Sequence, residues 1–474
     1  MKLSHFFNII NSSKNTFCDV EITSFEIYTS YLKKNSIYFL WHIGENAQRP
    51  LEIALKKGAY VVTSEKKYKD STDPHIIYVN SVRNSLKTLA MYQRTHYKGH
   101  IIAVTGSVGK SSVKNMLSQI LSMRYSTLYT LGNENAWLGI YCTLANIKDN
   151  TKFVVLETGA SGPGSLSIPI QVVKPTISIL LDVNFSHQEK YVNFTELLLE
   201  KASIIDNLSA NGWLVISNQT YKKLYNINYN FRKDIKLITV DTQIDSDAFY
   251  KINNIELNLK NTTADIYSDS VEKIILDQAN SANAINGTYA WVVMKQLGMS
   301  LDQFNSLIQF YKPLPRRFER LRVCSINGNI FELIDDAYNA SPISALNAIN
   351  SIQIRKSRRK ILVFGDMLEL GNRTLELHQN LFNQPIFSQF DKILLIGEVS
   401  HKCTLPFNAD FVKNISEAYD LLQYFIEDGD LILLKASNSM NLYQLRKLLE
   451  SNAIHVTQAL SWFIENEYPI LLND

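Results

Sequence analysis

A buried strand that runs directly into a glycine-spaced turn and a helix constrains this chain more than any other feature. The strand is the apolar, β-branched run 101–105, and the turn after it ends in Lys110 and two hydroxyls. A helical stripe of apolar residues starts at Val113. The turn's N–H groups, the helix dipole and the lysine all favour an anion, and a hydroxyl after the lysine suits Mg²⁺. The segment therefore predicts a phosphate-binding loop.

The loop has the tight Gly-x-x-Gly-Lys-Ser form. The longer general P-loop pattern places its first glycine where this chain has Val104. A lysine at an ordinary strand–helix turn is the competing interpretation, and the strand–turn–helix context disfavours it. We predict nucleotide binding by Gly106, Ser107, Val108, Gly109, Lys110, Ser111 and Ser112.

Length and composition indicate an ordinary globular protein. The 474 residues suffice for about three domains, and a net charge of +3 is too small to favour nucleic acid as a partner. The four cysteines are scattered without a C-x-x-C pair, so we expect reduced thiols and neither disulfides nor a zinc site. No apolar run reaches the roughly 18 residues that cross a bilayer, and the first residues lack a signal-peptide pattern. We therefore expect a cytoplasmic protein without membrane insertion.

The pattern of strands and helices predicts an α/β protein of three domains. Residues 1–98 read as a small α/β domain, residues 99–312 as a central P-loop domain with a parallel sheet, and residues 313–474 as a Rossmann-like domain after a Pro-Leu-Pro linker. The expected strands are 36–41, 58–62, 101–105, 153–157, 177–183, 213–217, 330–334, 360–365, 392–397 and 431–434. We also expect helices over 50–57 and from about Asn280, and a β-rich insert over 236–275.

Three polar residues lie at predicted strand ends, where ligands gather in open parallel sheets, or on the helix that follows. Glu157 ends one strand, His187 follows the next, and Lys201 lies on the helix after it. A carboxylate in the position of Glu157 suits the Mg²⁺ that bridges nucleotide phosphates. Each residue also has a structural interpretation on its own: a solvated rim glutamate, a structural histidine and a surface lysine.

Together, eight ordered motifs resemble those of the Mur ligase family, ATP-dependent enzymes that join an acid to an amino acid or peptide. The branch that adds D-alanyl-D-alanine to the cell-wall precursor is the most similar. The motifs are the loop 105–112, 132–135, 157–160, 187–189 with Lys201, 280–284, 313–317, 335–342 and 365–371.

The resemblance implies ATP and Mg²⁺ as cofactors and an acyl-phosphate intermediate that an amine converts to an amide. Lys110 would hold the β- and γ-phosphates, and Ser111 and Glu157 one Mg²⁺. Lys201 would be carbamylated and, with His187, would hold a second Mg²⁺ or position the phosphate. Further nucleotide contacts would come from Asn280, Asn283, Arg317 and Asp336. Substrate contacts would come from Asn133, Asn135, Tyr338, Asn339, Lys435 and Ser437. For the last two, a strand-end lysine and a turn serine are an equally good interpretation.

The chain departs from the family at both substrate ends. The stretch 23–30 lacks the Asp-(Ser/Thr)-Arg motif of the uridine site, and Lys-Gly-Ser-Arg becomes Lys-Ala-Ser-Asn over 435–438. Two hypotheses on the acid follow: the cell-wall precursor, or an acid of a capsule, glycan or natural-product pathway. A non-catalytic nucleotide-binding scaffold is disfavoured by the retained site residues, and a GTPase by the lack of an Asn-Lys-x-Asp motif. The family default is a monomer.

Overall fold

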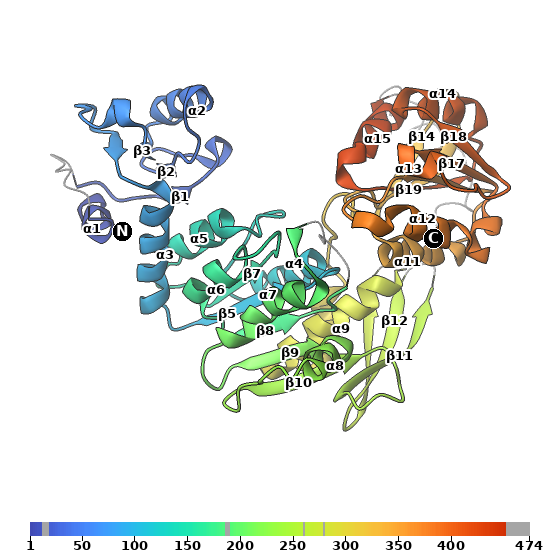
Figure 1. Cartoon of the computed structure of the whole chain (residues 1–474), viewed down its shortest axis with the longest axis horizontal. Coiled ribbons are helices and arrows are strands. Elements are labelled where there is room, and N and C mark those ends of the chain that lie inside the picture. The colour runs from blue at the N-terminus through green and yellow to red at the C-terminus, as the bar shows by residue number, and fades with distance from the viewer. Residues whose placement is uncertain (12–18, 185–189, 259–260, 278–279, 452–474) are drawn as a thin grey trace, which may run out of the picture. The chain divides into compact units, whose positions relative to one another are not determined.

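The computed structural model describes residues 1–11, 19–184, 190–258, 261–277 and 280–451. Contacts divide the chain into two compact units. The first comprises residues 1–106, 117–183 and 195–238, and the second comprises residues 107–116, 184–194 and those from 239 onward. Figure 1 shows both units and labels many of their elements. The α/β class predicted from the sequence is confirmed.

The first unit begins with α1 (Leu3–Ile9) and a small parallel sheet. The strands lie in the order β1 (Phe25–Glu26), β2 (Ile37–Phe39), β3 (Tyr60–Thr63) and β4 (Ile76–Tyr78). Helix α2 (Glu45–Lys56) starts earlier than predicted and buries Ala47, Leu51 and Ala54 against Tyr38 and Val61. Helix α3 (Val82–His96) then leads to the next sheet.

The same unit contains the four predicted parallel strands of the central domain and one strand, β6 (Thr127–Tyr129), that was not predicted. Their order is β9 (Trp213–Ser217), β8 (Ile177–Leu180), β5 (His100–Thr105), β7 (Phe153–Glu157) and β6. The predicted strand 177–183 ends early, because the Val183 N–H donates to the Thr220 hydroxyl and not to a neighbouring strand. The associated helices are α5 (Trp137–Ala145), α6 (Ser167–Val173), α7 (Phe194–Asp206) and α8 (Asn218–Asn226). Chain continuity leads from β5 through residues 106–109 into α4 (Lys110–Ser122).

In the second unit the β-rich insert predicted over 236–275 forms four strands. β10 (Lys236–Asp241) pairs in parallel with β11 (Tyr250–Leu257), and β12 (Thr262–Tyr267) and β13 (Val271–Leu276) continue antiparallel. Helix α9 (Ser281–Gln296) contacts the last three of these strands, and α10 (Leu301–Ile308) packs beside it.

The C-terminal sheet of the second unit brings distant motifs to one edge. Its order is β14 (Glu319–Cys324), β15 (Ile330–Asp335), β19 (Leu431–Lys435), β16 (Lys360–Gly365), β17 (Lys392–Ile396) and β18 (Ala409–Val412), with only the β14–β15 pair antiparallel among these strands. Because β19 lies between β15 and β16, the segments after all three strands meet.

Apolar cores cover both faces of this sheet, as a doubly wound domain requires. Alternate residues of β16 enter different cores: Leu362 and Phe364 on one face, Ile361 and Val363 on the other. Helices α11 (Pro342–Gln353) and α12 (Thr374–Phe382) pack on the first face, and α14 (Ile415–Phe425) and α15 (Leu442–Ser451) on the second. A short helix, α13 (Glu398–His401), follows β17. None of the helices in the described ranges has the length and apolarity needed to span a membrane.

Candidate active site

The glycine-rich loop depends on two glycines with positive φ. Gly106 has φ of 151° and Gly109 has φ of 89°. A β-carbon on Gly106 would lie 2.6 Å from the β-carbon of Leu181, the residue after β8. The chain can therefore leave β5 at this point only because Gly106 has no side chain.

Within the second unit, the loop residue Ser107 forms hydrogen bonds with Asn184 and Lys110. The Ser107 hydroxyl donates to the Asn184 carbonyl at 2.9 Å and accepts from the Asn184 N–H at 2.9 Å. The Lys110 Nζ donates to the Ser107 carbonyl at 3.1 Å. The ammonium that the sequence assigns to the phosphates thus lies over the loop that would bind them.

Glu157, at the end of β7, has an oxygen suited to a cation. Its side chain is buried, and Oε1 accepts from Asn135 Nδ2 at 3.0 Å, while Oε2 is buried without a hydrogen-bond partner. Asn135 is itself held by the Gly159 N–H, which donates to its carbonyl at 2.8 Å, and its own N–H donates to the Asn133 carbonyl at 2.7 Å. Asn135, predicted as a substrate contact, therefore orients the carboxylate.

Lys201 lies on α7 and is 1% exposed. Its Nζ donates to the Gly106 carbonyl at 2.9 Å, so the lysine reaches the start of the glycine-rich loop from within the first unit. Its carbamylation stays a prediction. His187, predicted to act with it, lies outside the described residues.

The donor set suits Mg²⁺ better than a metal enclosed by protein side chains. Among the described residues, no three or more His, Cys, Asp or Glu side chains gather in a way that could hold a metal. Mg²⁺ is ordinarily held by one or two carboxylates together with waters and substrate phosphates. The free Oε2 of Glu157 and the buried hydroxyl of Ser111 are the kind of oxygen ligand it takes.

Arg317 and Ser111, both predicted to contact nucleotide or metal, are in direct contact. Arg317 Nη2 donates to Ser111 Oγ at 2.9 Å, and the guanidinium carbon lies 4.1 Å from the centroid of the Tyr338 ring. Arg317 Nε is buried without a hydrogen-bond partner. A stacked guanidinium with an unused buried donor is suited to bind an anion such as a phosphate.

Asn280 and Asn283, the other predicted nucleotide contacts, lie at the start of α9. The Asn280 side chain caps this helix by accepting from the Ala282 N–H at 2.9 Å. Asn283 is buried in the first turn of the helix. Their contact with adenine stays a prediction.

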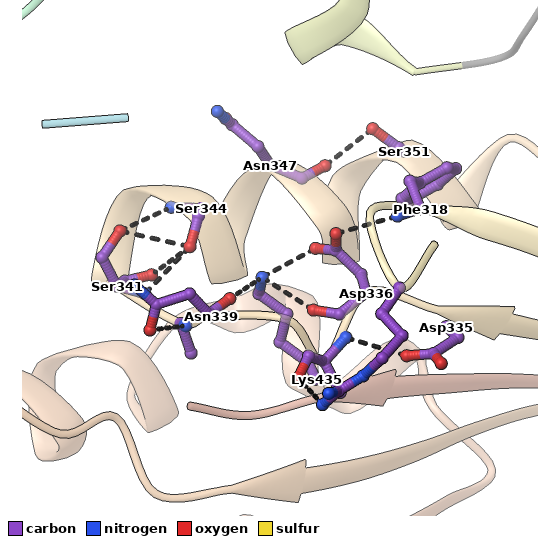
Figure 2. Close-up of polar contacts among 12 residues, drawn as sticks. Phe318, Asp335, Asp336, Asn339, Ser341, Ser344, Asn347, Ser351 and Lys435 are labelled. Atoms are coloured by element: carbon purple, nitrogen blue, oxygen red, sulfur yellow. Dashed lines mark hydrogen bonds and ion pairs between the residues drawn. The ribbon is translucent and has the colours of Figure 1, made fainter. Parts of the chain in front are cut away.

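Lys435 and Asp336 form a pair at the end of the C-terminal sheet (Figure 2). Lys435 Nζ donates to Asp336 Oδ2 at 2.7 Å, to the Asp336 carbonyl at 3.1 Å and to the Asn339 carbonyl at 2.7 Å. Burial raises the pKa of Asp336, and Lys435 and Arg317 offset part of that rise. Ser437, two residues after Lys435, accepts from the Leu368 N–H at 2.8 Å. Lys435 and Ser437, both predicted as substrate contacts, thus bind the protein's own motif loops 335–342 and 365–371.

Two family models match the chain. The model of the Mur ligase middle domain matches residues 104–294, and the model described as Mur ligase, glutamate ligase domain matches residues 316–438. Together they span more than half of the sequence. The chain belongs to the Mur ligase family. The resemblance inferred from the motifs is confirmed, and this Mur ligase is an enzyme of the ligase class.

Curated relatives extend the match over most of the chain. The UDP-N-acetylmuramoyl-tripeptide–D-alanyl-D-alanine ligase of Rickettsia prowazekii is 26% identical and aligns with 87% of this chain and 91% of its own. The enzyme of that name from Bacillus subtilis is 26% identical, with 85% and 87% covered.

Solved structures share the fold. MurF from Acinetobacter baumannii has a TM-score of 0.78 at 21% identity, covering 94% of this chain and 98% of its own. MurF from Thermotoga maritima in complex with ADP has a TM-score of 0.76 at 22% identity, covering 91% and 97%. The three-domain α/β architecture expected for this Mur ligase is thereby confirmed.

Sequence reasoning missed residues that shape the site of this Mur ligase. Thr105, which opens the motif 105–112 but was assigned no role in the site, has a buried hydroxyl without a hydrogen-bond partner. Asn184 holds Ser107, and Asn115 Nδ2 donates to the Lys312 carbonyl at 2.9 Å, which connects α4 to the linker. A polar residue at the end of an apolar strand was a usable signal for Thr105. The two asparagines act across long sequence separations and gave none.

Proposed function

We propose that this Mur ligase joins D-alanyl-D-alanine to a UDP-N-acetylmuramoyl-tripeptide and converts ATP to ADP and phosphate. The observation that carries the proposal is that relatives bearing this name align with more than four-fifths of this chain and of their own. The placement of Arg317 against Ser111 supports the use of a nucleotide phosphate. ATP supply would locate the reaction in the cytoplasm.

The chemistry explains why a nucleotide is needed. A carboxylate repels an amine, and its oxygen is a poor leaving group. In the first step a carboxylate oxygen attacks the γ-phosphorus and ADP leaves, which forms an acyl phosphate. In the second step the amine nitrogen attacks the acyl carbon, phosphate leaves and the nitrogen loses a proton. Each step needs mainly positioning and charge neutralisation.

Residues of this chain are suited to these tasks. The loop amides and Lys110 would hold the β- and γ-phosphates, and Arg317 would offer its unused Nε to an anion. Glu157 and Ser111 would hold Mg²⁺, and Lys201 would act near the loop start that it contacts. Bound Mg²⁺ supplies neutralisation of the phosphate charge.

One observation favours the second hypothesis, the same chemistry on a different acid. In the stretch 23–30, where the uridine-site motif of the family is absent, the Tyr28 hydroxyl donates to Glu134. Burial and this carboxylate raise the pKa of Tyr28. The backbone N–H of Phe25 donates to Asn146 Oδ1 at 3.0 Å, so this stretch is held by the residue that follows α5. A different set of groups would therefore face an acid at this place.

ADP release over a panel of acids and amines tests both hypotheses. The proposal expects release that needs UDP-N-acetylmuramoyl-tripeptide and D-alanyl-D-alanine together. Release with another acid would favour the second hypothesis. Release without any amine would indicate an NTPase, and the absence of release with every pair would favour a scaffold.

A further inference from the structure

The linker turn around Arg317 has an unusual backbone. Arg316 has φ of 62° and Phe318 has φ of 57°, so two residues with side chains adopt left-handed conformations on either side of Arg317. Such conformations are disfavoured for any residue with a β-carbon. The turn 316–318 therefore needs contacts from elsewhere to keep its shape.

These contacts come from the segment after β15. The Phe318 N–H donates to Asp336 Oδ1 at 3.0 Å, and the Tyr338 N–H donates to the Arg316 carbonyl at 3.1 Å. The Arg316 side chain also donates to the Ala337 carbonyl. Both ends of the turn are thus fastened to residues 336–338.

Lys435 in turn fastens that segment. An ammonium group has three donors, and Lys435 directs them to two oxygens of Asp336 and to the Asn339 carbonyl. The lysine side chain is 2% exposed. In Figure 2, Asp336 lies between Lys435 and Phe318, with one carboxylate oxygen bound to each. Asp336 therefore connects Lys435, the last residue of β19, to the turn 316–318.

We infer that Lys435 is a positioning residue, which acts through Asp336 to hold the turn 316–318 and so keeps Arg317 between Ser111 and Tyr338. The inference rests on the proposed function, because it assigns Arg317 to the nucleotide phosphates. It differs from direct contact of Lys435 with the amine substrate, since the three donors of the lysine already bind carbonyl and carboxylate oxygens of the chain itself.

The test measures how much Mg–ATP affinity is lost through Arg317→Ala in two backgrounds of the full-length protein, native and Lys435→Met. The readouts are the Kd of Mg–ATP by calorimetry, and kcat with separate KM values for ATP and amine. In the native background we expect Arg317→Ala to weaken Mg–ATP binding roughly 10- to 100-fold, the size of a charged hydrogen bond. In the Lys435→Met background we expect Arg317→Ala to weaken Mg–ATP binding by less than about a further threefold, because the effects of two residues that act as one unit do not add.

Two further variants keep the test interpretable. Lys392→Met makes the same change at the first residue of β17, where the lysine pairs with the half-exposed Asp410, and we expect unchanged Mg–ATP binding. If Lys435→Met does not fold, the charge-matched pair Asp336→Asn with Lys435→Met replaces it, and the cost of Arg317→Ala is measured there.

Two results would overturn the inference. One is an Arg317→Ala cost that is equal in both backgrounds. The other is a Lys435→Met variant with a raised KM for the amine and an unchanged KM for ATP, which would place the lysine at the amine. A native protein that binds no Mg–ATP would instead reject the proposed function, and that outcome is visible before any variant is made.

Discussion

Substitution of Gly106 by alanine tests whether the phosphate-binding loop depends on the close approach of two strand ends. The new β-carbon would lie 2.6 Å from the Leu181 β-carbon and 3.2 Å from its α-carbon. Neither atom can move by a side-chain rotation, so the segment after β5 or β8 must shift. The loop amides would shift with it, and they are the groups that would bind phosphate.

Gly162 supplies a matched control. Its φ of 152° is almost that of Gly106, and nothing lies within 4 Å of an added β-carbon. Alanine at either position therefore meets nearly the same unfavourable φ, at a cost of about 1–3 kcal/mol. Overpacking adds about 1–3 kcal/mol at Gly106 alone. We expect Gly106→Ala to lose about 2–6 kcal/mol of unfolding free energy and Gly162→Ala about 1–3 kcal/mol.

Chemical denaturation gives the free energy of unfolding, and calorimetry gives the Kd of Mg–ATP. We expect Mg–ATP affinity to fall at least roughly tenfold in Gly106→Ala, which corresponds to about 1.4 kcal/mol, and to stay unchanged in Gly162→Ala. Equal losses of stability in the two variants, or unchanged nucleotide affinity in Gly106→Ala, would refute the reasoning.

Three other predictions follow from side chains described in the structure. His378 Nε2 accepts from the Met367 N–H at 2.9 Å, so the imidazole is neutral, and burial lowers its pKa below 6.5. Its contribution to stability is present above pH 6.5 and is lost as the pH falls through the lower folded pKa. Urea midpoints should therefore fall less steeply below pH 6.5 in His378→Asn than in the native protein, and equal slopes would contradict this. Asn135→Ala should weaken Mg²⁺ binding about 10- to 100-fold, because it removes the hydrogen bond that orients Glu157. The Mg²⁺ dependence of ATP binding measures this, and an unchanged dependence would show that the asparagine does not support the metal site. Asp430→Asn should cost about 3 kcal/mol of unfolding free energy, because the Asp430 side chain is fully buried and accepts two hydrogen bonds from Arg359, at 2.7 and 3.0 Å. A loss under about 1 kcal/mol in a denaturant titration would contradict this prediction.

Much of the fold was predictable, because the central strands are apolar and bounded by turn residues. Residues 153–157, 213–217 and 360–365 were predicted as strands with the bounds that the structure has. The strand β14 was missed, since charged residues occupy its first, second and fourth positions at a sheet edge. The position of β19 between β15 and β16 was also beyond sequence reasoning, because strand order depends on contacts between segments far apart in the sequence, such as Glu332 with Leu431 and Lys360 with Leu431.

The candidate site, like the fold, could be predicted from the sequence only in part. The loop 106–112 was predictable from local spacing, since glycine conformation and helix start are local properties. The partners of Asn135, Asp336 and Lys435 were not, because each is decided by hydrogen bonds across tens of residues. Family motifs located these side chains, and the structure gives them roles in orienting other groups.

The central place of β19 has a consequence for how this protein matures on the ribosome. Until residues 431–435 have emerged, β15 and β16 each lack the neighbour they share, and their backbone groups are open edges. Open edges invite pairing with other chains. A nascent polypeptide stalled before that strand should therefore be prone to aggregation and a substrate for chaperones, although most of its sheet has already been translated.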